Sequence, residues 1–111
     1  MITYIELWKA RQTWKDMNQE ERGNYLTALD PAIQQLVESG VQIVSWGENE
    51  SSTFKKADFD YFAVWSFPDV ETAKQFEQMV EAAGWYNYFD QVNVMGNTTG
   101  PQQVIKKMIE A

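Results

Sequence analysis

The sequence predicts an α+β fold in which helices pack on one face of a four-stranded antiparallel sheet. Four short runs rich in β-branched and aromatic residues, at positions 2–8, 41–46, 59–67 and 91–95, alternate between two kinds of side chain. Strands produce such alternation because successive side chains point to opposite faces. Between the runs lie segments with apolar residues at helical spacing. Together these patterns predict strands connected by amphipathic helices.

Length and composition narrow the possible functions. A chain of 111 residues is expected to form a single domain spanning residues 1–111. The net charge of −7 and the absence of a basic cluster argue against nucleic-acid binding. No apolar run reaches the ~18 residues of a membrane span, and the first strand begins at the amino terminus without a signal sequence. We therefore expect a cytoplasmic protein without nucleic-acid or membrane partners.

Two residue types are absent from the sequence, cysteine and histidine. Their absence removes thiol catalysis, the commonest general base, the commonest metal ligand and the usual haem ligand. We therefore expect neither a metal nor a cofactor, and any chemistry must use carboxylates, Tyr, Lys, Asn or Trp.

The segment between the first two strands predicts a helix in two pieces. Asn18 and Glu21 have the spacing of a capping box. Pro31 interrupts the apolar stripe that follows, and proline inside a helix removes a backbone donor. Asp30 followed by Pro31 can begin a second piece as N-cap and first helical residue. Gly40 is typical of the position just after a helix.

The second half of the chain predicts a loop and two more helices. Residues 48–58 form a polar loop whose carboxylates do not match the spacing of a calcium-binding EF-hand. Asp69 can cap a second helix that ends at Gly84. Residues 85–89 hold four aromatic side chains, which form either a lid or a wedge between helix and sheet. Residues 102–109 predict a short C-terminal helix.

The order of elements defines the expected topology. Strand, helix, strand, strand, helix, strand is the βαββαβ order of the ferredoxin-like fold, with both helices on one face of the sheet. Right-handed crossovers place the first and third strands at the centre.

The two faces of the predicted sheet differ in chemistry. One set is aliphatic or Phe: Ile5, Leu7, Val41, Ile43, Phe62, Val64, Val92 and Val94. The other is aromatic and polar: Tyr4, Glu6, Trp8, Gln42, Val44, Trp46, Tyr61, Ala63, Trp65, Gln91, Asn93 and Met95. We expect the first set to face the helices. The second set would then be an exposed patch too large for a monomer, so we expect a second copy or a ligand to cover it.

This order and sorting resemble the dimeric α+β barrel superfamily, which includes cofactor-independent antibiotic-biosynthesis monooxygenases. Residues 41–47, 57–64 and 84–93 are also similar to stretches of a family of uncharacterised small bacterial proteins within it. The resemblance implies a homodimer formed sheet to sheet, with a pocket near the open sheet face. It implies no particular activity.

The aromatic and polar set supplies the candidate site residues. Glu6 lies among aromatic residues, where a carboxylate loses solvation and can serve as a general base, or can simply hold the dimer in register. The candidate catalytic residues are Glu6, Asn93 and Tyr61. The candidate ligand-binding residues are Tyr4, Trp8, Trp46, Trp65, Gln91 and Met95. Each of the amides and tryptophans has an alternative structural role in the dimer.

Three functions fit these residues. The first is a cofactor-independent monooxygenase-like enzyme for a planar aromatic or polyketide-like molecule, with Glu6 as base and Asn93 and Tyr61 as hydrogen-bond donors. The second is a non-catalytic homodimer that binds a small, aromatic or hydrophobic molecule. The third is a purely structural homodimer. The volume of the cavity discriminates between the last and the other two.

Overall fold

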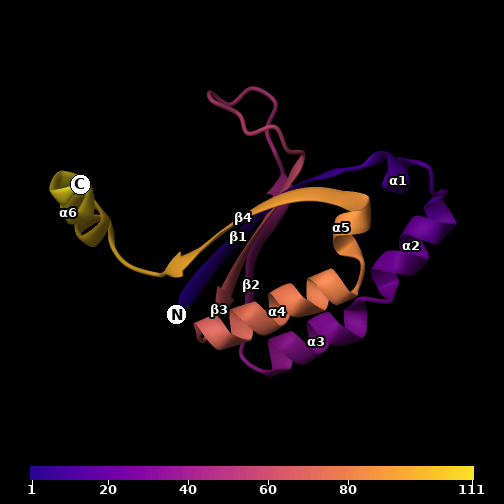
Figure 1. Ribbon diagram of the computed structural model, residues 1–111, viewed down its shortest axis with the longest axis horizontal. Helices are drawn as coiled ribbons and strands as arrows, with labels where there is room; N and C mark the ends of the chain where they lie inside the picture. Colours follow the sequence, from indigo (N-terminus) through magenta and orange to yellow (C-terminus); the bar gives the residue numbers. More distant parts are fainter.

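The computed structural model describes residues 1–111 and is built on a four-stranded antiparallel sheet with the order β2-β3-β1-β4. The strands are β1 (Ile2–Ala10), β2 (Gln42–Glu48), β3 (Tyr61–Phe67) and β4 (Phe89–Asn97). β1 pairs with β3 and β4, whereas β2 pairs with β3 alone (Figure 1). The prediction that the first and third strands are central is confirmed.

Six helices accompany the sheet and make the fold α+β. Three of them, α1 (Gln12–Lys15), α2 (Gln19–Thr27) and α3 (Asp30–Glu38), connect β1 to β2. Two more, α4 (Val70–Ala82) and α5 (Trp85–Tyr88), connect β3 to β4, and α6 (Pro101–Glu110) follows β4. The predicted βαββαβ order is therefore not followed strictly, since α1 and α5 are additional short helices in the two crossovers.

Local signals in the sequence explain why the first crossover is divided. Asn18 and Glu21 form a complete capping box at α2, with 2.8 Å from the Glu21 amide to Asn18 Oδ1 and 3.1 Å from the Asn18 amide to Glu21 Oε1. Pro31 lies in the first turn of α3, where its missing N–H costs no helical hydrogen bond. Gly40 follows α3 at φ +100°, a left-handed conformation that favours glycine. The two-piece helix is confirmed, although Asp30 is its first helical residue and not its cap.

The second crossover also follows the predicted signals. The Asp69 side chain accepts the Thr72 amide at 2.8 Å and caps α4. Gly84 follows α4 at φ +76° and ends it. The capping and the glycine stop were both readable in the sequence because each depends on a few neighbouring residues.

The helices cover the aromatic and polar face of the sheet, so the predicted assignment of faces is inverted. Tyr4, Glu6 and Trp65 are buried beneath the helices, whereas Val92 and Val94 remain 48% and 62% exposed. Large rings from sheet and helix fill the layer between them: the Phe76 ring of α4 lies 5.6 Å from the Tyr4 ring and 5.1 Å from the Trp65 ring. The polar atoms that suggested an open face have partners inside the protein, and no buried side-chain polar atom lacks one.

A register shift in β2 explains a second error. Strict alternation places Ile43 and Trp46 on opposite faces, but Ile43 lies opposite Trp65 and Trp46 lies opposite Ala63. The shift falls between Ile43 and Ser45, where one extra residue interrupts the pairing. Trp46 therefore shares a face with Ile43 and turns toward the helices.

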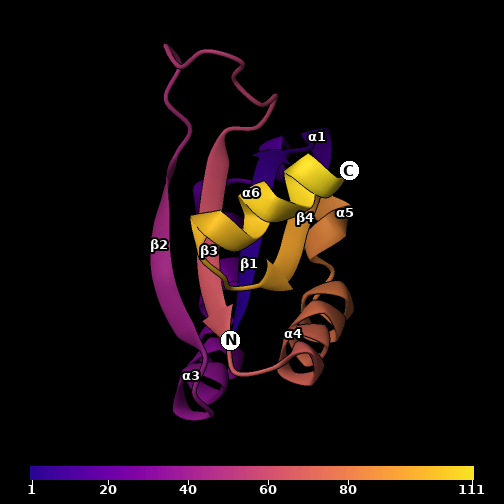
Figure 2. The same ribbon diagram turned by 90° about the vertical axis from the view of Figure 1, so that its left-hand side faces the viewer.

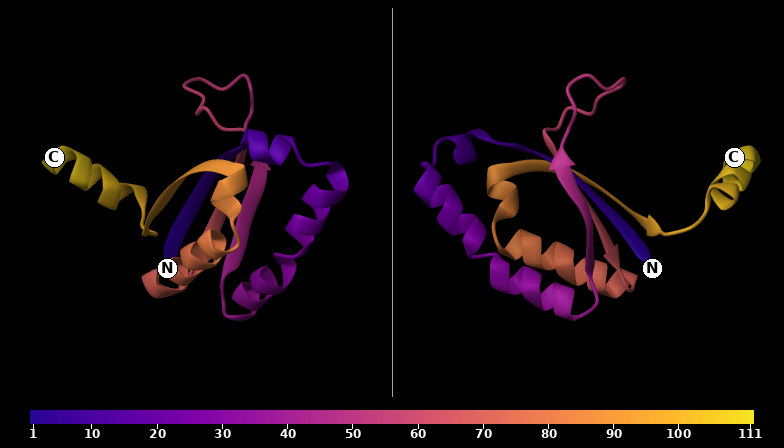
Figure 3. Two further views of the ribbon diagram at one scale, coloured as in Figure 1. Left: turned by 45° about the vertical axis from the view of Figure 1, so that its right-hand side comes forward. Right: turned by 180° about the vertical axis from the view of Figure 1, so that it is seen from behind.

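The other face of the sheet is uncovered and apolar. We call it the open face and define it by six residues on three adjacent strands: Ile5, Leu7, Phe62, Val64, Val92 and Val94. Helix α6 stands away from the body of the protein on this side, as Figures 1 and 2 show, and Figure 3 gives the same arrangement from two other directions. The radius of gyration is 15.9 Å, above the ~13 Å typical of about 100 residues, because α6 extends outward.

None of the six helices has both the length and the apolar character that crossing a bilayer requires.

Candidate functional site: the tryptophan pocket

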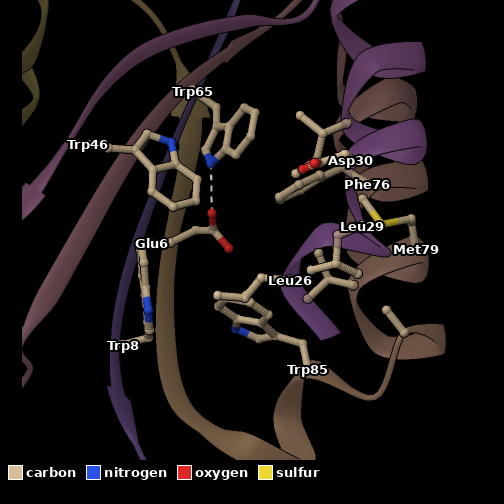
Figure 4. Close-up of a pocket in the computed structure, with 13 residues that line it drawn as sticks. Glu6, Trp8, Leu26, Leu29, Asp30, Trp46, Trp65, Phe76, Met79 and Trp85 are labelled. Atoms are coloured by element: carbon tan, nitrogen blue, oxygen red, sulfur yellow. Dashed lines mark hydrogen bonds between the residues drawn. The ribbon is translucent and has the colours of Figure 1, made fainter. Parts of the chain in front are cut away.

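A cavity of about 260 Å³ lies between the sheet and helices α2, α3 and α4. We call it the tryptophan pocket because four of its walls are tryptophan side chains (Figure 4). It is lined by Glu6, Trp8, Leu26, Leu29, Asp30, Ile33, Trp46, Trp65, Phe76, Met79, Val80, Ala83 and Trp85. The two carboxylates are the only charged side chains among these residues. A cavity of about 150 Å³ holds benzene, so this one has room for a molecule of one or two rings.

Glu6 is the buried polar residue of this pocket, with only 5% of its surface exposed. It comes from β1, one of the two central strands of the sheet, and lies opposite Ala63 of β3 and Asn93 of β4. The indole N–H of Trp65 donates to Glu6 Oε1 at 2.6 Å. The amide of Gln91 donates to Glu6 Oε2 at 2.7 Å. Each carboxylate oxygen is therefore held by one neutral donor and keeps further acceptor capacity.

Gln91 connects Glu6 to a wider hydrogen-bond network. Its Oε1 accepts the indole N–H of Trp85 at 2.7 Å, and its Nε2 also donates to Asn93 Oδ1 at 2.8 Å. The amide orientation of Gln91 is thus determined by Trp85 on one side and by Glu6 on the other. The network fixes the position of the carboxylate relative to two of the tryptophan walls.

Burial raises the pKa of Glu6 above its ordinary value, because it disfavours the charged form. The hydrogen bonds from Trp65 and Gln91 oppose this increase, since they stabilise the carboxylate. Burial also raises the pKa of the nearby Tyr4 and Tyr86 phenols. The protonation state of Glu6 therefore depends on the balance between its burial and these two hydrogen bonds.

The tryptophan rings meet at steep angles. The Trp46 ring lies 5.2 Å from the Trp8 ring at 71° and 5.8 Å from the Trp65 ring at 73°. The Trp85 ring lies 6.0 Å from the Trp8 ring at 67°. Figure 4 shows the Glu6 carboxylate among these four rings, with Asp30 and the aliphatic residues of the helices on the other side of the pocket.

The structure brings together four of the predicted site residues and separates the others from the pocket. Glu6, Trp8, Trp46 and Trp65 line it. Gln91 and Asn93 belong to the hydrogen-bond network behind Glu6, and do not line the cavity. The remaining predicted residues, Tyr4, Tyr61 and Met95, lie elsewhere on the sheet.

The positions of two of these residues do not match the predicted roles. Tyr61 is 38% exposed and packs against Trp8 with ring centres 5.8 Å apart, so it does not reach into the pocket. Tyr4 is a core residue whose hydroxyl donates to Glu77 Oε2 at 2.8 Å. The pocket therefore contains neither of the hydrogen-bond donors, Asn93 and Tyr61, that the enzyme hypothesis assigned to an oxyanion.

Residues from the helices and Trp85 complete the pocket and were missed in the sequence. Leu26 of α2, Leu29 at the N-cap of α3 and Ile33 of α3 form one apolar stripe, and Phe76 and Val80 belong to the stripe of α4. Their spacing indicated helices facing a core, and nothing in that spacing distinguished a cavity wall from a filled core. Trp85 was visible as part of an aromatic run, but the interpretation left its role open.

The short helix α5 is anchored to the rest of the protein. The Arg11 amide donates to the Tyr88 carbonyl at 2.8 Å, and the Arg11 guanidinium donates to the Tyr86 carbonyl at 2.7 Å. The hydroxyl of Thr13 donates to the carbonyl of Asn87. These contacts favour the wedge over the lid, and α5 also supplies Trp85 as a fixed wall of the pocket.

No group of three or more Asp and Glu side chains converges closely enough to hold a metal ion.

Fold and site together define an α+β protein with a helix-covered antiparallel sheet and one aromatic pocket that encloses a carboxylate. The chain belongs to the family described as "Family of unknown function (DUF6616)", whose model matches residues 1–111. A comparison with curated proteins found no match.

Proposed function

We propose that the protein binds a small, mainly apolar molecule of one or two rings in the tryptophan pocket, with Glu6 as its polar anchor. The observation that carries this proposal is the buried Glu6 carboxylate at the wall of a cavity of about 260 Å³ whose other lining residues, apart from Asp30, are hydrophobic. Ligand pockets characteristically combine apolar walls with a few fixed polar groups. A core that served only for stability would gain nothing from a cavity, since voids cost free energy.

The volume limits the size of the ligand. At about 260 Å³ the pocket lies just below the ~300–1,000 Å³ that drug-sized ligands occupy. A molecule of one or two rings therefore fits, whereas a polyketide of several fused rings does not. Of the planar aromatic and polyketide-like molecules considered from the sequence, only those of one or two rings remain candidates.

The indole N–H resonances of the five tryptophans provide the test. Trp8, Trp46, Trp65 and Trp85 line the pocket, whereas Trp14 packs outside it against Phe89, 4.7 Å away. A library of one- and two-ring compounds should include ligands that shift the resonances of the lining tryptophans and leave that of Trp14 in place. Mass spectrometry of small molecules that co-purify with the protein supplies independent candidates. A screen in which no lining tryptophan responds would overturn the proposal.

A catalytic role is the second candidate, and Glu6 alone carries it. Burial raises the pKa of Glu6 and so makes its carboxylate a stronger base, and the resemblance to cofactor-independent monooxygenases points to the same role. The N–H donors closest to the carboxylate, those of Trp65 and Gln91, are already bonded to it. If the protein is an enzyme of this type, Glu6→Gln should abolish turnover of every accepted substrate. Unchanged turnover would remove Glu6 from the role of base.

We also propose a homodimer in which the open faces of two copies pack together. The six residues that define the open face are all apolar, and three strands present them side by side. Stacked sheets pack about 10 Å apart with their side chains interdigitated, and a two-fold axis makes one such patch complementary to itself. The resemblance to dimeric α+β barrels supports the same arrangement.

The position of helix α6 is a further argument that a second copy of the chain covers the open face. Val104, Ile105, Met108 and Ile109 form an apolar stripe that remains about half to four-fifths exposed. The stripe cannot pack on its own sheet in this conformation, because α6 stands away from the body (Figure 1). A two-fold dimer would bury the open faces and the two α6 stripes in the same assembly. Light scattering tests the proposal, and a monodisperse monomer at micromolar concentration would defeat it.

A further inference from the structure

The charges around the tryptophan pocket are all of one sign. Glu6 and Asp30 line it, and no Lys or Arg does. The three ion pairs of the protein lie elsewhere: Lys9 with Asp58, Arg11 with Asp90, and Lys107 with Glu110. Glu6 is therefore a buried carboxylate with two neutral donors and no cationic partner. Buried charges in proteins are normally paired, so this carboxylate lacks the counter-ion that its burial calls for.

The walls of the pocket have the chemistry that attracts a cation. An aromatic ring carries negative electrostatic potential on its faces, and a cation within about 6 Å of the ring centre is attracted to it, most strongly for Trp. Consecutive rings in the series Trp65, Trp46, Trp8 and Trp85 meet at 73°, 71° and 67°. Steeply angled walls allow a single small group to contact more than one ring, as in the aromatic cages that recognise quaternary ammonium groups.

The far side of the pocket is suited to the remainder of such a molecule. Leu26, Leu29 and Met79 form an aliphatic wall opposite Glu6 (Figure 4). Asp30 lies on the same helical side and adds a second carboxylate. The net charge of −7 also attracts cations and repels anions at longer range.

We propose that the ligand of the tryptophan pocket is a small organic cation, a protonated amine or quaternary ammonium compound on a body of one or two rings. This inference rests on the proposed function, and specifies its ligand class. The cationic group lies against Glu6 among the tryptophan rings, where it supplies the missing counter-ion. The apolar body of the ligand lies against the aliphatic wall.

A matched pair of probes separates charge from shape. 1-Methylquinolinium and 1-methylnaphthalene have nearly the same size and outline, but only the first carries a positive charge. Titrations monitored on the tryptophan indole N–H resonances, with Trp14 as internal reference, give both affinities. We expect the cation to bind at least roughly tenfold more tightly, which corresponds to about 1.4 kcal/mol.

Variants of Glu6 and Asp30 test whether the preference for the cationic probe depends on these carboxylates. Glu6→Gln should bring the two affinities within about a factor of two of each other, and Asp30→Asn should reduce the preference without affecting the buried network. Glu77→Gln is the matched control, since Glu77 also accepts a hydrogen bond from a buried partner but does not line the pocket. It should retain the full preference for the cation.

The pH dependence gives a readout that does not depend on the folding of any variant. The titratable groups near Glu6 are Tyr4 on β1, Tyr86 on α5, Glu77 beyond Tyr4, and Asp30 across the pocket. Cation affinity should rise with pH as Glu6 ionises, while affinity for the neutral probe should stay level or fall.

The outcomes are distinct. If neither probe, nor any compound of the wider screen, shifts a lining tryptophan, the proposed function fails, and this inference with it. If both probes bind equally at a pH where Glu6 is ionised, or the neutral one binds better, the pocket is confirmed and the cation is refuted.

Discussion

Replacing Trp65 with Phe removes the indole N–H that holds Glu6 and leaves the rest of the pocket aromatic. Trp65 is 1% exposed, and its N–H lies 2.6 Å from Glu6 Oε1. In the Trp65→Phe variant this carboxylate oxygen has no donor, so the charged form of Glu6 loses one of the two bonds that oppose the effect of burial on its pKa. The variant should therefore be less stable, and Glu6 in it should be harder to ionise.

The expected magnitude has two parts. A hydrogen bond to a charged group contributes about 1.5–3 kcal/mol, whereas one between neutral groups contributes about 0.5–1.5 kcal/mol. The smaller ring also leaves a cavity, which adds about 1–2 kcal/mol at any pH. The free energy of unfolding should fall by about 3–4 kcal/mol where Glu6 is ionised and by about 1 kcal/mol less where it is protonated. Using about 2.1 cal/mol/K per residue for the entropy of unfolding, the larger loss lowers Tm by about 13–17 °C.

The sign of the pH dependence follows from linkage. A carboxyl group with a raised pKa in the folded protein favours folding at low pH, and this contribution is lost as pH rises through the folded pKa. The substitution raises the pKa of Glu6 in the folded protein further. The loss in free energy of unfolding caused by Trp65→Phe must therefore grow as pH rises from the pKa of Glu6 in the folded wild type to its pKa in the folded variant. That interval lies above the ordinary pKa of 4.5.

Urea denaturation followed by far-UV circular dichroism, at steps between about pH 4.5 and 8.5 and at a single protein concentration, measures this cost. Trp46→Phe is the matched control. Trp46 lines the same pocket and contacts the Trp65 ring, but its indole makes no hydrogen bond to Glu6. Trp46→Phe should lower the free energy of unfolding by less than Trp65→Phe does, and this loss should not depend on pH. A constant cost of Trp65→Phe across this range would refute the assigned role of the indole N–H.

Three further predictions concern the supports of the pocket and the proposed dimer. Asn18→Ala removes the capping box of α2, the helix that carries Leu26 into the pocket. The free energy of unfolding should fall by about 1 kcal/mol and Tm by about 4 °C. Asn18→Ser should restore most of this loss, because serine is also a favoured N-cap residue. Thermal denaturation measures both, and an unchanged Tm for Asn18→Ala would contradict the structural role of the cap. Val94→Lys places a charge on the open face and should raise the dimer dissociation constant at least tenfold in sedimentation equilibrium, whereas Val70→Lys, on α4 at the other face, should leave it unchanged. Equal effects of the two lysines would argue against the open face as the interface. Ile105→Glu combined with Met108→Glu should also weaken the dimer without lowering the stability of the monomer, since both side chains are more than half exposed; a dimer of unchanged affinity would exclude α6 from the interface.

Much of the fold could be predicted because its signals are local. The capping box at Asn18, the interruption at Pro31 and the glycines at positions 40 and 84 each depend on a few neighbouring residues, and all four mark real boundaries. Strand alternation located the four strands, and the handedness of crossovers placed β1 and β3 at the centre. The extra helices were missed because helices as short as α1 and α5 have too few turns to show a periodic pattern.

The choice between the two sheet faces could not be made from the sequence. Alternation shows that the faces differ, but it does not show which one the helices cover. The aromatic face was judged unfit for a core because it carries Glu6, Tyr4 and several indoles. In the folded protein the Tyr4 hydroxyl meets Glu77, 73 residues away, and the Trp65 N–H meets Glu6, 59 residues away. Such partners are distant in sequence, so no local pattern can reveal that these polar atoms are satisfied.

The sequence by itself determined that a carboxylate lies among tryptophans on a central strand, because Glu6, Trp8 and Trp65 alternate in phase on two strands expected to pair. Only the tertiary structure decided what surrounds that carboxylate. The packing of α2, α3 and α4 on the sheet leaves a cavity of about 260 Å³ beside Glu6, and the register shift in β2 turns Trp46 toward it. A cavity is the space left when side chains from distant segments fail to meet, and its position depends on how whole elements pack against one another.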